Sequence, residues 1–383
     1  MAAVLDGTGC PPRVTCQTPT TFLSLVNSAF LNGSTTKTEL IRNNIGNTAA
    51  RMDALSLTSS QRLAGLALNY FRPNPQFAQI FFQDSGGDSY YHALYFSARR
   101  TFEKGLTAGF SYTFSKSIDD MSVDPTGAST GGGLSTTSFS RTPTDVHNFA
   151  LDRSLSDFNN KHVVLANMLY EFPFGTGKQF FAGMPGWLNQ VVGGWSLTGI
   201  FNYQSGEPFT LSSGVRTTNT THTSTAVIVG PKINADQLIY NQPGIEGPVT
   251  YITGGFQQAT SLTGGNCQTV TGTQTSFCIP AAGQNGSGRN SVIGPDFWNL
   301  DSGLLKDFKL TERFKLQFRA EIFNVLNHPN FENPRNATVG SPTITSSGFG
   351  QTCCATAALA DQQNVNPVGE PMRVIQLGLK LDF

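Results

Sequence analysis

The sequence predicts an all-β fold: an antiparallel transmembrane β-barrel segment of about seven to eight strands, with long extracellular loops. Three features predict it: a strand-like alternation in the last residues, a strict alternation of short and long connections, and a composition poor in charge. A membrane barrel explains all three, because its exterior is thinly apolar, its interior is polar, and its two ends carry loops of unequal length.

The last residues of the chain, 373–383, alternate between apolar and polar side chains. A period of two is typical of a strand with one apolar and one polar face. Roughly ten residues ending on an aromatic match a transmembrane β-strand, and the alternative is the closing strand of a soluble sandwich. The apolar positions are Ile375, Leu377, Leu379, Leu381 and Phe383.

Six earlier segments show the same alternation. In 105–118, for example, Leu106 and Phe110 share one face while Thr107 and Ser111 share the other. A further segment, 76–84, alternates less cleanly and is a candidate eighth strand. The six predicted strands are 88–102, 105–118, 161–172, 194–205, 297–308 and 312–326.

The connections between these strands alternate in length. In chain order they are short (103–105), long (119–160), medium (173–193), very long (206–296), short (309–311) and long (327–372). Outer-membrane barrels have short periplasmic turns and long extracellular loops, whereas loops above about 15 residues are uncommon in compact soluble domains. The pattern therefore predicts that 206–296 and 327–372 are extracellular and that 103–105 and 309–311 are periplasmic.

Composition narrows the class of protein. Charged residues are 13% and hydrophobic residues 38% of the chain, and no run of about 18 apolar residues could form a membrane helix. The net charge is +0 and no basic stripe occurs, so nucleic acid is not an expected partner. The expected location is the cell outer membrane, with outer-membrane lipid as a partner.

The six cysteines form three local pairs in segments rich in glycine, serine and threonine. Disulfides that staple extracellular loops are favoured for the first two pairs, and metal binding is the rival interpretation, although neither CxxC spacing nor a neighbouring histidine occurs. The pairs are Cys10 with Cys16, Cys267 with Cys278, and Cys353 with Cys354.

Charged residues on segment 312–326 are predicted to face the barrel lumen: Arg313, Lys315, Arg319 and Glu321. They could contact an anionic solute or pair with lumen or plug carboxylates. Near the end of segment 105–118, a carboxylate cluster could bind Ca²⁺, but its spacing does not match an EF-hand. That cluster is Asp119, Asp120 and Asp124.

Catalysis has no constellation of residues to support it. The five histidines are scattered, without a second ligand at helical spacing, and no GxSxG, Walker-type or HExxH motif occurs. We therefore expect no enzyme activity, no cofactor and no metal site.

Several phrases resemble one family as a set: GGDSYYHALYFSARRTFEKGLTAGFSYTFSKSIDD, LYEFPFG, GGWSLTGIFNYQSGEPFTL and RFKLQFRAEIFNVLNHPNF. Together with the terminal strand, they resemble the C-terminal barrel of Oar-like TonB-dependent outer-membrane receptors, over roughly residues 66–383. The resemblance implies a barrel of about 22 strands, a plug, an N-terminal carboxypeptidase-regulatory-like domain and energy-coupled import through the TonB system. It also implies that the barrel-assembly machinery recognises the C-terminal strand, through Ile375, Leu377, Leu379, Leu381 and Phe383.

The chain departs from that family pattern. Nothing resembles the plug, the TonB-contacting segment or a signal peptide, so the chain is expected to be part of a larger barrel. Residues 1–75 are predicted to be a loop-rich extracellular region and 76–383 the C-terminal part of the barrel. Three functions compete: part of a TonB-dependent receptor that imports a large solute, a surface-exposed structural or adhesive barrel, and a soluble carbohydrate-binding sandwich.

Overall fold

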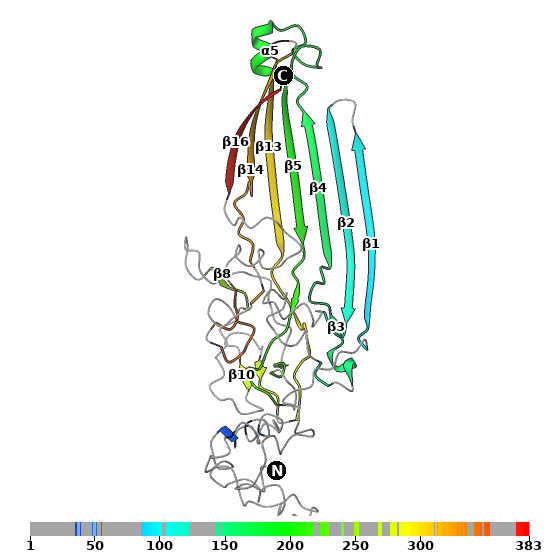
Figure 1. Ribbon diagram of the computed structural model, residues 1–383, viewed down its shortest axis with the longest axis vertical. Coiled ribbons are helices and arrows are strands. Elements are labelled where there is room, and N and C mark those ends of the chain that lie inside the picture. Colours follow the sequence, from blue (N-terminus) through cyan, green and yellow to red (C-terminus); the bar gives the residue numbers. More distant parts are fainter. Residues whose placement is uncertain are drawn as a thin grey trace, which may run out of the picture.

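The structure is a computed structural model, shown in Figure 1. It describes residues 86–101, 105–122, 143–145, 148–217, 223–229, 239–240, 249–252, 267–269, 276–281, 283–309, 311, 313–331, 333–334, 341–346, 348–352 and 373–382, with isolated residues between 35 and 55. The predicted region 1–75 therefore lies almost wholly outside the described residues. The candidate strand 76–84, the segment 353–372 and Phe383 lie outside them as well.

Seven long antiparallel strands form the main sheet in the order β1-β2-β4-β5-β13-β14-β16, and the short β3 pairs with β2. This order follows the sequence, which confirms the predicted antiparallel meander. The long strands are β1 Ser89–Thr101, β2 Leu106–Asp119, β4 His162–Glu171, β5 Trp195–Gln204, β13 Phe297–Lys309, β14 Lys315–Phe323 and β16 Val374–Asp382; β3 is Ser154–Leu155.

The register of the strands sorts side chains onto two faces. Opposite one another across four strands lie Phe110, Ala166, Phe201 and Leu300, which define the apolar face. The neighbouring row is polar except at Leu165 and belongs to the polar face; its members are Ser97, Ser111, Leu165, Asn202 and Asn299. A one-residue slip of any strand would exchange its faces, so the alternation of residues fixes the register.

The connections divide the molecule into two ends (Figure 1). We call the end with connections 102–105, 172–194 and 310–314 the turn end; it also carries the end of β16 and the helix α5, Gly186–Val192. Gly105 has a φ of 86°, a conformation that favours glycine in the tight turn between β1 and β2. The opposite end, formed by the long connections 120–161, 205–296 and 324–373, is called the loop end. Connection length thus sorts by end, as the sequence predicted.

The loop end folds into small sheets of its own. β6 (Pro208–Phe209) pairs with β12 (Val292–Ile293), and η4 (Phe149–Asp152) is a short 3-10 helix beside β3. Two three-stranded sheets have the orders β10-β11-β7 and β15-β9-β8. Their strands are β7 Val227–Val229, β8 Ile239–Tyr240, β9 Val249–Thr250, β10 Cys267–Thr269, β11 Ser276–Cys278 and β15 Gln351–Thr352.

The buried hydrophobic core of the described residues lies at the loop end, not in the sheet. Phe277 and Phe349 meet edge to face with ring centroids 5.1 Å apart, although they come from different long connections. Leu211 and Ile252 are fully buried beside them. Parts of both long connections, 206–296 and 327–372, therefore build a common core.

The sheet is open within the described residues, because β1 pairs only with β2 and β16 pairs only with β14. The backbone donors and acceptors on the outer side of each of these two strands therefore have no strand partner within the described residues. An open sheet agrees with the expectation from the sequence that these strands are part of a larger barrel. Among the helices that the structure describes, none has the length and apolar character needed to cross a membrane.

Candidate functional site

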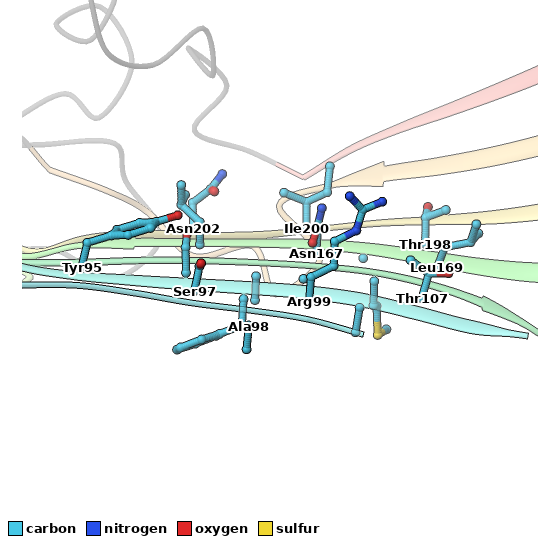
Figure 2. Close-up of a pocket in the computed structure, with 18 residues that line it drawn as sticks. Tyr95, Ser97, Ala98, Arg99, Thr107, Asn167, Leu169, Thr198, Ile200 and Asn202 are labelled. Atoms are coloured by element: carbon cyan, nitrogen blue, oxygen red, sulfur yellow. The ribbon is translucent and has the colours of Figure 1, made fainter. Parts of the chain in front are cut away.

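A hollow of about 910 Å³ lies over the first four long strands of the sheet (Figure 2). From β1, Tyr95, Ser97 and Arg99 project to the same side of the ribbon as Asn167 of β4 and Asn202 of β5, while Ala98 projects to the other. These side chains supply a guanidinium, two amides and hydroxyl groups, all suited to bind anionic or oxygen-rich solutes. Ile200 and Leu169 project to the same side, so the hollow is a candidate functional site of mixed polar and apolar lining on the polar face.

Glycine shapes the floor of this hollow. Gly109 lies directly between Arg99 and Asn167 in the strand register, and a Cβ atom there would collide with Oδ1 of Asn167. The missing side chain lets Asn167 lie across β2 toward β1. Arg99 is not among the residues predicted from the sequence, although its position two residues after Ser97, on the polar side of the strand, is a signal that could have identified it.

The predicted lumen residues of β14 lie on the polar face as well, but near the opposite edge of the sheet. Arg319 Nε donates to Gln317 Oε1 at 2.6 Å, and Gln317 Nε2 donates to Asp307 Oδ1 at 2.8 Å. Lys315 and Glu321 share this face of β14 by alternation, whereas Arg313 precedes the strand in the turn. The structure therefore does not bring these residues into the hollow around Arg99. Their contact with a solute stays a prediction.

The C-terminal strand pairs with β14 along its whole length, from Lys315 opposite Asp382 to Phe323 opposite Val374. Its apolar side chains project from the apolar face of the sheet and are largely exposed: Ile375 61%, Leu377 67%, Leu379 72% and Leu381 51%. Phe383 is outside the described residues. Recognition of this strand by the barrel-assembly machinery stays a prediction.

A buried arginine ties the loop end to the sheet. The Arg289 guanidinium forms an ion pair with Asp119 at the end of β2, and both side chains are almost completely buried. It also donates to Asp157 Oδ1 at 3.2 Å and Ser122 Oγ at 2.7 Å. The remaining bonds go to backbone oxygens of Asp119 and Asp152.

The two described carboxylates of the predicted Ca²⁺ cluster have partners within the protein instead of forming a metal site. Asp119 binds Arg289, and Asp120 accepts a hydrogen bond from the backbone of Asp88. Asp124 is outside the described residues, and no group of metal-ligating side chains occurs among the residues that the structure describes. The sequence offered no signal for Arg289, because it lies in a long connection without periodicity.

Glu207 lies just beyond β5 at the loop end. Burial raises the pKa of its carboxyl to about 6, and the nearby charge of Asp157 acts in the same direction, while a hydrogen bond from Asn160 opposes them. Near pH 6 this carboxyl is therefore protonated to a larger extent than an ordinary glutamate.

Cys278 is disulfide-bonded, and the residue opposite it in the strand register is Cys267. The register thus supports the predicted pairing of these two cysteines. The predicted disulfide between Cys10 and Cys16 lies outside the described residues, as do Cys353 and Cys354.

A family model for an outer membrane beta barrel domain matches residues 27–376. No curated protein and no solved structure matches the chain. The family match covers the whole main sheet except the last part of β16, and the family is one of the outer membrane. Together with the strand length, the single apolar face and the antiparallel order, it shows that the chain belongs to the family of outer membrane β-barrel domains.

Proposed function

We propose that the chain forms part of the wall and the surface region of an outer-membrane receptor that imports a large solute by energy-coupled transport. The observation that carries this proposal is the hollow of about 910 Å³ on the polar face, which Arg99, Asn167 and Asn202 line from three different strands. A polar face opposite a lipid-facing apolar face is the arrangement expected of a solute path. The family resemblance of the sequence adds the TonB system as the source of energy.

In this proposal the loop end is extracellular and the turn end is periplasmic. The support is the length of the connections, because outer-membrane barrels keep their short turns in the periplasm. A long connection such as 205–296 also has enough residues to build a binding surface. The chain would bind and move a solute and carry out no chemical reaction.

The same orientation gives β16 its proposed role. Its exposed apolar side chains, from Ile375 to Leu381, would be read by the barrel-assembly machinery before they face lipid. None of the described residues is proposed to form the plug that would contact TonB.

Uptake assays test the proposal. Cells that produce the protein and cells from which its gene is deleted are supplied separately with labelled oligopeptides, labelled oligosaccharides and a ferric chelate. We expect the deletion to abolish uptake of one of these classes, and a protonophore to do the same in unmodified cells. Arg99→Gln should reduce that uptake, whereas Lys178→Gln at the turn end should not.

The alternative function is a structural or adhesive surface barrel without transport. The packed core of the loop end favours it, because a folded surface region is also what a binding partner on another cell would contact. Unchanged uptake of all three classes in the deletion strain, combined with reduced attachment of those cells to surfaces, would support this alternative and contradict the receptor.

Epitope tags test the orientation independently. A tag inserted near residue 260 should be labelled by antibody on intact cells, whereas a tag near residue 310 should be labelled only after the outer membrane is opened. Labelling of the tag near residue 310 on intact cells, but not of the tag near residue 260, would show that the orientation is the opposite of the one proposed.

A further inference from the structure

The connection 172–194 at the turn end presents apolar side chains to its surroundings. Phe180, Phe181, Trp187 and Val191 are all exposed, and Trp187 is the most exposed of them at 73%. Trp187 and Val191 are four residues apart in α5, so they share one face of this helix. Four exposed large apolar side chains within one connection indicate an interaction surface.

Two sets of contacts join this patch to the lipid-facing side of the sheet. The first is a run of aromatic rings that begins at Tyr170 on the apolar face of β4 and continues along the connection. Centroid distances are 5.5 Å from Tyr170 to Phe172, 6.1 Å from Phe172 to Phe174, and 6.1 Å from Phe174 to Phe181. The exposed rings are therefore continuous with the apolar face.

The second set of contacts comes from β5 and β13. Trp195, on the apolar face, donates a hydrogen bond from Nε1 to the backbone oxygen of Val191 at 2.9 Å. Lys306, also on the apolar face, donates to the backbone oxygen of Gly193 at the end of α5. Its ammonium lies 5.6 Å from the centre of the Trp195 ring and 5.0 Å from that of Phe308.

Lys306 joins α5 to the sheet. Only 1% of this residue is exposed, so its ammonium is satisfied inside the protein, by the Gly193 carbonyl and the Trp195 and Phe308 rings. Tryptophan and other aromatic residues gather at the boundary between headgroups and acyl chains in membrane barrels. The residues around α5 therefore have the composition of the boundary between headgroups and acyl chains.

The backbone holds one ring of the patch outward at a conformational cost. Phe181 has a φ of 63°, which is rare for a bulky residue and indicates local strain. In this conformation its side chain is 65% exposed. An apolar environment outside the protein would offset this cost.

We propose that the connection 172–194 is a membrane-interface anchor whose exposed side chains Phe180, Phe181, Trp187 and Val191 insert into phospholipid. Its short helix α5 would lie along the membrane boundary, with its apolar face toward the acyl chains. In the proposed orientation this phospholipid is the periplasmic leaflet of the outer membrane. The anchor would fix the height and tilt of β4, β5 and β13 in the membrane.

Quenching of tryptophan fluorescence tests the anchor. The full chain is assembled in phosphatidylcholine nanodiscs whose acyl chains carry bromine either near the headgroup or near the methyl end. The emission of Trp187 is obtained by subtracting the emission spectrum of the Trp187→Phe variant from that of the unmodified protein. We expect this emission to be blue-shifted, to lose most of its intensity to the shallow bromines, and to lose less to the deep ones.

A control tryptophan is placed at the loop end by Leu151→Trp, since Leu151 is exposed there. Its emission should be the same with and without bromine. If the emission of Trp187 is equally insensitive to bromine, the patch faces water or a periplasmic protein, and the anchor is disproved.

Proteolysis at Lys178 gives a second measurement, because nanodiscs leave both sides of the membrane accessible. Lys178 lies within the connection and is partly exposed. Trypsin should cleave after it several-fold faster in the double variant Trp187→Ser and Val191→Ser than in the unmodified protein. Equal rates would contradict the anchor. Because the nanodisc has phospholipid on both sides, neither result depends on orientation or on transport.

Discussion

The membrane sheet and the loop end use apolar side chains in opposite ways. On the sheet, Leu379 and its neighbours in β16 point outward, and the polar residues lie on the other face. At the loop end, Phe277 is completely buried and polar residues surround the core. The difference follows from the solvent: lipid favours exposed apolar groups, whereas water drives them into a core. A substitution should therefore have opposite effects in the two regions.

The largest expected effect is at the core of the loop end. Phe277→Ala should reduce the free energy of unfolding of this region by about 3 to 5 kcal/mol, because it removes a buried ring and leaves a cavity. Denaturant unfolding followed by near-UV circular dichroism would measure the loss. Leu151→Ala, at an exposed site of the same region, serves as the control and should change it little.

Arg289→Met should be nearly as costly as Phe277→Ala. It leaves the buried carboxylate of Asp119 without its partner, which typically costs about 3 to 5 kcal/mol. Lys178→Met, which breaks the exposed pair with Glu171, should cost less than about 1 kcal/mol. Comparable unfolding midpoints for the two variants would show that the Arg289 cluster does not stabilise the loop end.

On the sheet, Leu379→Arg should destabilise the protein by about 2 to 4 kcal/mol in lipid, because a cation would enter the hydrocarbon. Lys380→Leu, one residue later on the polar face, should be tolerated. Folding yields in phospholipid vesicles would compare the two. Equal yields would mean that the faces are assigned wrongly.

The smallest expected effect is the pH dependence due to Glu207. Its pKa is raised from 4.5 to about 6 in the folded protein, so the folded state binds the proton more tightly. Its contribution to stability is present below about pH 4.5 and is lost as pH rises through about 6, a change of at most about 2 kcal/mol. Thermal unfolding between these pH values should show the change, and Glu207→Gln should abolish it. If Glu207→Gln shows the same dependence of thermal stability on pH as the unmodified protein, Glu207 is not the group responsible for it.

Most of the sheet could be predicted from the sequence, because each spanning strand alternates over about ten residues. The predicted strand 161–172 differs from β4 by one residue at each end. The prediction was too long at 312–326, because Phe314 continues the alternation. There, Thr311 Oγ1 accepts hydrogen bonds from the backbone of Arg313 and Phe314 and holds a turn instead.

The loop end could not be predicted in the same way. Its strands are two or three residues long, too short for a period to appear. Its core joins residues from different connections, as Phe277 and Phe349 illustrate. The hollow on the polar face could not be predicted either. Arg99, Asn167 and Asn202 come from three strands, and only the strand register places them around one hollow.

The five hydrogen bonds of Arg289 have a consequence for anyone who replaces surface segments of this protein. One guanidinium joins β2, the segment around Asp152 and Asp157, and its own connection. A foreign epitope that replaced only one of these segments would remove either the Arg289 cation or some of its acceptors. The group that remained in the other segments would then be a buried charge without its full set of partners. The three pieces therefore form one exchangeable module, and grafts or natural recombination should succeed when they carry all of them together.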